Sequence, residues 1–516
     1  MMWYRCDERG VQLYRPEARD FWTTSDFIDT EGLAACRRAI PTRLRENEIT
    51  HSCSIIERIP STTYLQPALL TPWIRYLPGF IRIHIEGRQS FLKVIDNLAW
   101  LFVDNIVRMA VSLFVGIWIA RYLGPVQFGQ YSYAIAFITI FSMAGALAAD
   151  ANVVRDVVRE PSARGEILGT ATFLKFLGGL MGAVLCMGTI IILRPEDTVV
   201  KWLVIILAAG ITFQAMETIA LWFQAQVQSK YTVWAKNIAV LIMASVKVTL
   251  VLLNAPIVAF AWAGLAEALL STLALIIVYQ MSGQHISTWL LDLHRAKAML
   301  RDSWPLLISA LTAVLYLRID VVMLGEMHSE AAVGIYGAAT RISEAWYFIP
   351  MALVASLQPS IMQAKEHSEE LFQARLRQVY NLMSALSISV AAVVTLFADQ
   401  LVRLLFGQSY EAAGAVLAVH VWAAVAVSLG VVSSQYLIVE NLQKISMYRT
   451  TIGLMCNLGL NVFLIPKYGA LGAAVATLIS YSLATLSMGI FVQGRQQTVM
   501  MLRSLNPLEW RFLSFR

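Results

Sequence analysis

Residues 305–325 read Pro305-Leu-Leu-Ile-Ser-Ala-Leu-Thr-Ala-Val-Leu-Tyr-Leu-Arg-Ile-Asp-Val-Val-Met-Leu-Gly325, an apolar run of membrane-span length that carries two opposite charges, Arg318 and Asp320. A charged side chain near the middle of a membrane helix costs about 2.5–3.5 kcal/mol on insertion scales, so its presence indicates a function. Residues two apart on a helix point about 200° apart, so the two charges are not expected to pair or to face one cavity. One should face a wet lumen or a partner helix, and the other needs a second partner. Which of them faces the lumen stays open.

Composition extends the membrane interpretation to the whole chain. Hydrophobic residues make up 58% of the 516 residues and charged residues only 14%, with a mean hydropathy of +0.61. A soluble domain carries about 25% charged residues. The net charge of +6 lies mostly at predicted helix ends and in the tails, which favours anionic lipid headgroups over nucleic acid as partners. Five cysteines without CxxC spacing or nearby His clusters predict neither a metal site nor a disulfide framework.

The apolar runs predict an all-α, polytopic membrane protein with about twelve transmembrane helices in two six-helix bundles, related by a pseudo-two-fold along the membrane normal. The spans are expected near 97–120, 131–151, 170–193, 199–222, 236–253, 256–279, 305–325, 333–360, 379–398, 413–436, 449–465 and 469–492. Lys and Arg concentrate in the tails and in the loops after even-numbered spans, while loops after odd-numbered spans hold few. The positive-inside rule therefore predicts that both termini are cytoplasmic.

Short repeats support two halves of the same orientation. Gly129-Gln-Tyr131 opens the second predicted span and Gly334-Ile-Tyr336 opens the eighth, each after a Leu-Gly pair. Gly264-Leu-Ala266 in the sixth span has a counterpart in Gly472-Ala-Ala474 in the twelfth. Each match alone can arise by chance among small residues of membrane helices, but their common order favours a true repeat. Such repeats bind substrate at their interface near the midplane.

The predicted organisation has five parts: an N-terminal extension at 1–90, six-helix bundles at 91–284 and 305–494, a cytoplasmic inter-bundle loop at 285–304, and a cytoplasmic basic tail at 495–516. The extension is polar and Arg-rich. We expect it to be disordered, or to be translated upstream of the natural start, with a short amphipathic segment at the headgroups as the alternative.

Charged pairs lie within other predicted spans. Asp104 and Arg108 are four residues apart, so they can neutralise each other along one helix face, an interpretation that weighs equally with a functional one. Arg341 and Glu344 are three apart and invite the same interpretation.

Three further charged residues lie within predicted spans. Lys247 has no charged neighbour within a helical turn, whereas the two glutamates have more than one candidate partner. Lys247 is a candidate for a lumen-facing cation, with snorkelling as the alternative. Glu217 and Glu267 are candidate proton carriers, or ion-pair partners of Lys247 or Arg341.

Signatures of motors and hydrolases are absent from the sequence. It contains no GxxxxGK[ST] phosphate loop, no HExxH and no GxSxG, and no acidic cluster in a long outer loop. A transporter without a bound cofactor is therefore favoured over an enzyme. A membrane glycan polymerase or ligase, the rival of a different class, would need a large outer loop with essential Arg, Asp or His residues.

Several motifs together resemble the Wzx-type polysaccharide flippases of the multidrug/oligosaccharidyl-lipid/polysaccharide exporter superfamily. They are Ala120-Arg-Tyr-Leu-Gly-Pro-Val-Gln-Phe-Gly-Gln-Tyr131, Val154-Arg-Asp-Val, Arg164-Gly-Glu-Ile-Leu-Gly169, Trp222-Phe-Gln-Ala225, Leu317-Arg-Ile-Asp320, Met323-Leu-Gly325, Val333-Gly-Ile-Tyr336, Ala339-Thr-Arg-Ile-Ser-Glu344 and Ile349-Pro350. The resemblance covers about 91–495, and residues 1–90 fall outside it.

The resemblance implies a flippase that moves an undecaprenyl-diphosphate-linked glycan from the cytoplasmic to the periplasmic leaflet of the bacterial inner membrane, by alternating access, for O-antigen, capsule or exopolysaccharide synthesis. Arg318, Lys247 and Arg341 would attract the anionic cargo, and Asp320 would be a structural or coupling partner. Coupling to an H⁺ or Na⁺ gradient, a glycan polymerase and a chain-length regulator are further expectations. The nearest rival is a cation-coupled multidrug antiporter of the same superfamily, whose cargo would favour an acidic or aromatic lumen.

Overall fold

The computed structural model describes residues 3–7, 10–14 and 89–510. Strand β1 (Trp3–Asp7) pairs antiparallel with β2 (Gly10–Tyr14) in a hairpin. Residues 1–84 form one compact unit and residues 85–516 another. Most of the predicted N-terminal extension lies outside the described residues, so its disorder and its origin stay predictions.

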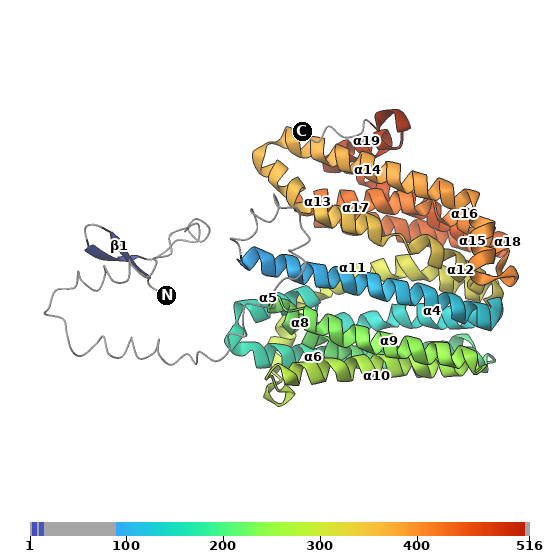
Figure 1. Cartoon of the computed structure of the whole chain (residues 1–516), viewed down its shortest axis with the longest axis horizontal. Helices are drawn as coiled ribbons and strands as arrows, with labels where there is room; N and C mark the ends of the chain where they lie inside the picture. The colour runs from blue at the N-terminus through green and yellow to red at the C-terminus, as the bar shows by residue number, and fades with distance from the viewer. Residues whose placement is uncertain (1–2, 8–9, 15–88, 511–516) are drawn as a thin grey trace. The chain divides into compact units, whose positions relative to one another are not determined.

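The second unit is built from helices (Figure 1). Those of the first half are α4 (Gln89–Ser142), η4 (Met143–Leu147), α5 (Asp150–Arg159), η5 (Pro161–Ala163), α6 (Arg164–Leu193), α7 (Thr198–Ala209), η6 (Gly210–Glu217), α8 (Thr218–Ala225), α9 (Lys230–Leu252), α10 (Ile257–Met281) and η7 (Ile286–Thr288). Those of the second half are α11 (Leu293–Met327), α12 (Glu330–Glu344), α13 (Phe348–His367), α14 (Glu369–Leu396), α15 (Ala398–Phe406), η8 (Gln408–Tyr410), α16 (Ala413–His420), α17 (Ala423–Val439), α18 (Gln443–Leu486), η9 (Ser487–Ile490), η10 (Val492–Gly494), α19 (Arg495–Ser504) and η11 (Pro507–Glu509).

Two long helices each contain two spans. The described residues hold 10 helical stretches that are long and apolar enough to cross a membrane. In α4, Gly124 has φ 69° and precedes Pro125, and in α18, Gly469 has φ 55°. These left-handed torsions favour glycine and interrupt the helix. Because the first and the last stretch are each divided in this way, the described part has the predicted twelve spans.

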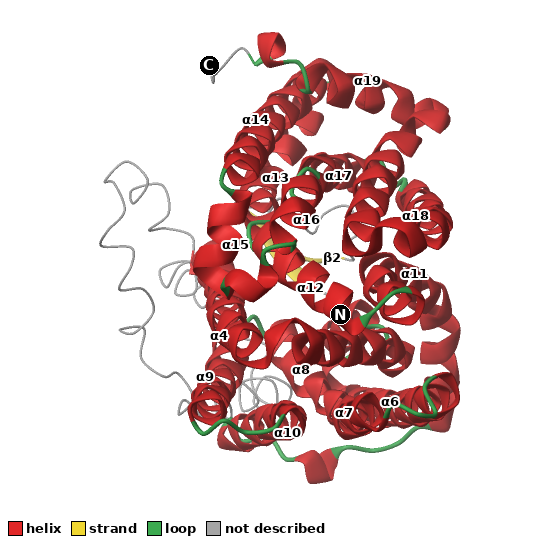
Figure 2. Cartoon of the chain, turned by 90° about the vertical axis from the view of Figure 1, so that its right-hand side faces the viewer, coloured by secondary structure: helices red, strands yellow, loops and turns green. Residues whose placement is uncertain are grey.

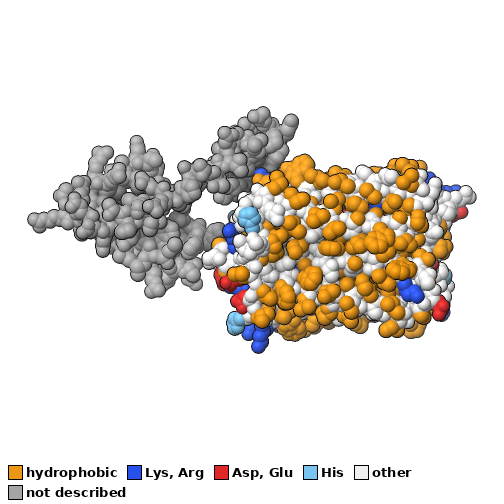
Figure 3. All heavy atoms as spheres, turned by 90° about the horizontal axis from the view of Figure 1, so that it is seen from below, with side chains coloured by type: hydrophobic (Ala, Val, Ile, Leu, Met, Phe, Trp, Pro, Cys, Tyr) orange, Lys and Arg blue, Asp and Glu red, His pale blue; other side chains and the backbone are white. Residues whose placement is uncertain are grey.

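The helices expose a continuous apolar surface. Large side chains that point outward include Phe114, Trp234 and Phe463, which are 66%, 57% and 71% exposed. Figure 3 shows hydrophobic side chains covering the helix bodies, with Lys, Arg, Asp and Glu gathered toward the two ends. A surface of this size would be unstable in water but matches lipid acyl chains. The protein is therefore a multi-pass membrane protein.

The two halves meet along α4, α11 and α12 (Figure 2). The repeated glycines lie in this contact. A Cβ atom on Gly129 would lie 1.8 Å from the Glu330 carbonyl oxygen, and one on Gly334 would lie 1.9 Å from the Pro125 carbonyl oxygen. Each repeat glycine thus packs against backbone of the other half, which explains why both helices have a glycine there.

The segment predicted as the loop 285–304 is helical from Leu293 onward. The Asp292 carboxylate accepts hydrogen bonds from the backbone N–H of His294 (2.8 Å) and Arg295 (3.3 Å), which caps α11 about three turns earlier than hydropathy indicated. The tail predicted at 495–516 contains α19, which packs on α14 through Ser504 and Ser384, whose hydroxyl oxygens lie 2.7 Å apart. The division into two bundles at this connection remains our proposal.

Candidate functional site

A cavity of about 250 Å³ lies within the first half, against α12 of the second. Its lining residues come from α4, α9, α10 and α12, and they are Arg108, Val111, Ser112, Val115, Gly116, Ile119, Tyr131, Ile135, Val240, Ala244, Lys247, Glu267 and Arg341. Four of the charged residues predicted as site residues are thus brought together from four parts of the chain. They comprise three cations and one carboxylate.

Arg108 lines this cavity, and one nitrogen of its guanidinium has no hydrogen-bond partner among the described residues. Its Nε donates to Asp104 Oδ1 at 2.9 Å, which confirms the predicted pair, and Asn237 donates to the same oxygen at 2.9 Å. The Nη2 atom of Arg108 is buried and has no hydrogen-bond partner. Since an unpaired buried donor is costly, Nη2 is a place where an anionic ligand would be stabilised.

Lys247 is held by Glu267. The Nζ atom lies 2.6 Å from Glu267 Oε2, and the two side chains are 17% and 31% exposed. The sequence left open whether Glu267 pairs with Lys247, and the structure shows this pair between α9 and α10. This pair contributes no net charge to the cavity.

Arg341 is the uncompensated cation of the cavity. Its guanidinium occupies space left by Gly116, where a Cβ atom would lie 1.3 Å from Nη1, and it stacks over the Phe128 ring at 5.0 Å. Nη1 also approaches the Ser112 carbonyl oxygen at 3.4 Å. Within 89–510 Arg341 forms no ion pair, so the predicted pairing with Glu344 is wrong: their spacing allows contact, but Arg341 extends toward α4 instead.

Glu217 lies away from the cavity. Its carboxylate pairs with Lys236 at 2.8 Å, and its side chain is 52% exposed. The predicted partners Lys247 and Arg341 are therefore wrong for Glu217. The physical reason is that the η6 segment places Glu217 beside the first turns of α9, where Lys236 is within reach.

Arg318 and Asp320 occupy different surroundings, as their helical spacing predicted. Arg318 is exposed, and its charge acts on Arg341 and Glu344. Asp320 is only 3% exposed. Its role and that of Arg318 in transport stay predictions.

Asp320 is the centre of a buried polar cluster formed by α11, α12 and α18. It accepts hydrogen bonds from Thr477 Oγ1 at 2.6 Å, Asn461 Nδ2 at 2.9 Å and Tyr336 Oη at 3.0 Å. Nearby, Asn461 Oδ1 and Asn457 Nδ2 have no hydrogen-bond partner. Asp320 thus accepts hydrogen bonds from two hydroxyls and one amide nitrogen, and such donors stabilise its ionised form inside the membrane unit. No group of three or more His, Cys, Asp or Glu side chains suited to metal binding occurs among the described residues.

Sequence reasoning missed several residues of these sites. Tyr131 lines the cavity, and its repeat counterpart Tyr336 binds Asp320. The repeat pointed to both tyrosines without indicating that they contact charged groups. Asn457 and Asn461 are four apart in an apolar span, and that spacing was a usable signal for a buried polar face.

Comparison with known proteins is consistent with a transporter fold. The profile of the family described as polysaccharide biosynthesis protein matches residues 94–365, more than half of the chain, and that of the MatE family matches residues 305–463. No curated protein sequence matches the chain.

Solved structures of low identity share the fold. The lipid II flippase MurJ, in an inward closed conformation, aligns with a TM-score of 0.64 and 15% identity over 78% of this chain and 90% of MurJ. A multidrug resistance MATE family transporter of the MOP superfamily, in an inward-facing conformation, aligns with a TM-score of 0.59 and 15% identity over 77% of this chain and 96% of its own. A MOP superfamily transporter from Pyrococcus furiosus, with a binding pocket described as of reverse polarity, aligns with a TM-score of 0.55 and 15% identity over 79% and 96%.

The family match over residues 94–365 contains most of α4 and all of α12, the helices along which the two halves meet. The chain belongs to the polysaccharide biosynthesis protein family and has the fold of the MOP superfamily flippases and transporters.

Proposed function

We propose that the protein is a flippase that moves an undecaprenyl-diphosphate-linked glycan repeat unit across the bacterial inner membrane, for O-antigen, capsule or exopolysaccharide synthesis. The observation that carries this proposal is the cation excess of the cavity. Asp104 and Glu267 each form an ion pair with one of the three cations, and Arg341 forms no ion pair with a carboxylate among the described residues. A diphosphate needs such a charge to leave water, whereas its lipid tail can stay in the bilayer.

The rival cation-coupled antiporter is supported by the MatE match over 305–463. An organic cation would nevertheless be repelled by the positive charges of Arg341 and Arg108, which both line the cavity. The charge of the cavity thus favours an anionic cargo. A polymerase or ligase would need an extramembrane catalytic loop, and the connections between the described helices are short.

Orientation and partners complete the proposal. The charge asymmetry of the loops favours cytoplasmic termini, and we propose that the glycan enters from the cytoplasmic side. A glycan polymerase and a chain-length regulator would then act on the delivered repeat units. Alternating access would arise from rocking of the two halves about α4, α11 and α12.

Deletion and complementation test the proposed function. We expect that loss of the gene abolishes a surface polysaccharide and leaves lipid-linked repeat units facing the cytoplasm. Arg318→Ala should fail to restore the polysaccharide although the protein inserts, because the exposed guanidinium lies near the charges of the site. The matched control is Arg301→Gln, since the Arg301 side chain is 82% exposed and its ion pair within residues 89–510 is with its neighbour Asp302. Full complementation by Arg318→Ala would remove Arg318 from the cargo path, and a deletion without effect on polysaccharide would contradict the proposed function.

We further propose that Asp320 couples transport to an H⁺ or Na⁺ gradient. Asp320→Asn keeps the size of the side chain but removes its charge, so flipping in proteoliposomes should no longer respond to either gradient. The rate with and without an imposed H⁺ gradient, and separately a Na⁺ gradient, is the measurement. Glu411→Gln, which removes an exposed carboxylate outside the cluster, should keep the response of the unmodified protein. A response retained by Asp320→Asn would refute this role.

A further inference from the structure

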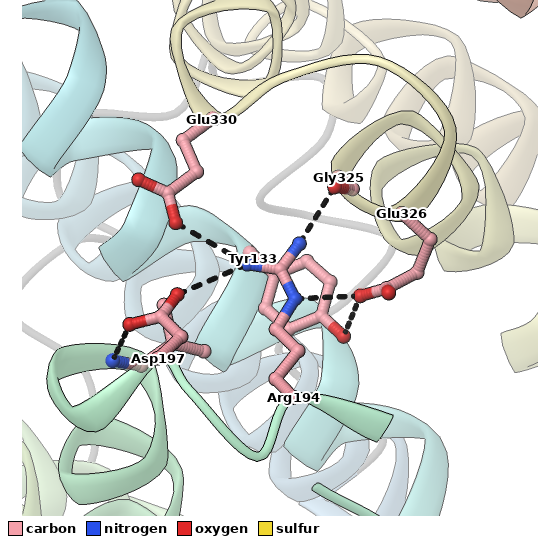
Figure 4. Close-up of polar contacts among 7 residues, drawn as sticks. Tyr133, Arg194, Asp197, Gly325, Glu326 and Glu330 are labelled. Atoms are coloured by element: carbon pink, nitrogen blue, oxygen red, sulfur yellow. Dashed lines mark hydrogen bonds and ion pairs between the residues drawn. The ribbon is translucent and has the colours of Figure 1, made fainter.

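Arg194, in the connection between α6 and α7, contacts both halves of the membrane unit (Figure 4). Its Nε donates to Glu326 Oε1 at 2.8 Å, and its Nη2 donates to the Gly325 carbonyl oxygen at 2.6 Å. Both acceptors belong to the last turn of α11 in the second half. One side chain therefore satisfies a carboxylate and a helix-terminal carbonyl across the contact between the halves.

The remaining guanidinium donor binds two more carboxylates. Nη1 lies 3.3 Å from Asp197 Oδ2 in the first half and 3.2 Å from Glu330 Oε1 at the start of α12. The Asp197 carboxylate also caps α7 by accepting from Val200 N–H at 3.0 Å, which fixes its position. The guanidinium is thus surrounded by three carboxylates, two of them from the second half.

Tyr133 of α4 contacts both Glu326 and Arg194. Its hydroxyl donates to Glu326 Oε1 at 2.6 Å, and the Arg194 guanidinium carbon lies 4.3 Å above the centre of its ring. Gly325 makes room for that ring, because a Cβ atom there would lie 2.5 Å from Tyr133 Cδ2. The Arg194 side chain is only 12% exposed.

Burial lowers the pKa of Arg194, but the hydrogen bond and the charge of Glu326 outweigh burial and raise it above its ordinary value. Arg194 therefore stays a cation under all physiological conditions. Without it, three carboxylates would face one another across the contact, and their repulsion would push the halves apart.

We propose that Arg194 is a latch that closes one end of the cavity by holding the two halves together, and that it must release before the cavity opens at that end. The close packing of Gly129 on Glu330 and of Gly334 on Pro125 lies in the same region and seals it when the latch is engaged. The purpose of the opening, release of a glycan on the periplasmic side, rests on the proposed function. The latch role itself is inferred from the contacts of Arg194 with both halves and does not depend on the cargo.

The test measures access to the cavity, whatever the cargo is. A reporter, Val115→Cys, is placed on the cavity wall after the five natural cysteines are replaced by Ala. A second chain carries Glu196→Cys, which is exposed beside Arg194 and marks that side of the membrane. Both are treated with a membrane-impermeant maleimide in right-side-out and in inside-out vesicles.

Arg194→Gln should increase reporter labelling about tenfold from the side marked by residue 196, the change that a shift of about 1.4 kcal/mol in the open–closed equilibrium produces. Arg194→Gln combined with Glu326→Gln and Glu330→Gln should open less than Arg194→Gln alone, because the carboxylate repulsion is also removed. Arg403→Gln, which breaks an ion pair with Glu411 within the second half, should label like the unmodified chain.

If the reporter is labelled equally in Arg194→Gln and in the unmodified chain, the proposed latch role of Arg194 is wrong. It is also wrong if Arg403→Gln increases labelling as much as Arg194→Gln does. A monodisperse elution profile in detergent shows that each variant is folded. If Arg194→Gln is not folded, the triple variant, in which Asp197 is the one carboxylate of the three left charged, is compared with the unmodified chain instead. Faster labelling together with normal polysaccharide in a deletion strain would support the latch and reject the proposed function, so the two failures are distinguishable.

Discussion

Arg341→Gln is expected to lower the rate of glycan flipping by about 10- to 100-fold. A hydrogen bond between charged groups contributes about 1.5–3 kcal/mol, and about 1.4 kcal/mol corresponds to a factor of ten. Arg341 is the cavity cation without a carboxylate partner among the described residues, so its charge is available to the diphosphate. Arg341→Lys should retain part of the rate, because it keeps the charge but not the planar fork of donors.

The measurement uses purified protein in liposomes that contain an undecaprenyl-diphosphate-linked glycan. Exposure of the sugar is followed with an impermeant reagent, and Arg301→Gln is again the control. Gly116→Ala tests the position of the charge independently: its Cβ would displace the flexible end of Arg341 and should slow flipping while the fold remains stable. Unchanged rates in both Arg341→Gln and Gly116→Ala would exclude the cavity as the path of the anion.

Gly334→Leu is expected to destabilise the membrane unit by at least about 3 kcal/mol, the upper end of typical overpacking costs. Even a Cβ atom on Gly334 would lie 1.9 Å from the Pro125 carbonyl oxygen, and backbone cannot move aside as a side-chain end can. The new side chain must therefore separate α4 from α12, which is the main contact between the halves. Thermal unfolding in detergent, followed by loss of the monodisperse elution peak, measures the effect.

Gly459→Ala is the matched control for Gly334→Leu. Gly459 lies in α18, and a Cβ atom there would meet nothing within 4 Å. The substitution should change stability by no more than about 1 kcal/mol, in the stabilising direction given by helix propensity. If Gly334→Leu unfolds at the same temperature as the unmodified chain, the repeat glycines do not form the contact between the halves.

Hydropathy and loop charge were enough to predict the spans, because a membrane span is specified locally by about 20 apolar residues. Gly124 beside Pro125 lies between the predicted spans 97–120 and 131–151, and Gly469 lies at the predicted start of the span 469–492. Local signals also misled in one place: the polar residues before Pro305 indicated a loop, but Asp292 caps a helix that begins at Leu293. The start of such a helix depends on a single N-capping residue more than on the composition of the segment.

Charge partners could not be predicted reliably from spacing, even where both residues lie on one helix face. Asp104 and Arg108 pair as their four-residue spacing indicated, whereas Arg341 and Glu344, three apart, do not. The difference is tertiary, because Gly116 on another helix opens a space into which Arg341 extends.

By itself, the sequence determined that this chain spans the membrane about twelve times and that Arg318 and Asp320 face different surroundings. These properties follow from the solvation cost of each span and from the geometry of one helix. The tertiary structure alone decided that Arg341 is an uncompensated cation, that Asp320 has Thr477 and Asn461 as partners, and that Arg194 joins the halves. Arg194 and Gly325, for example, are 131 residues apart in the sequence, so only tertiary packing brings them together.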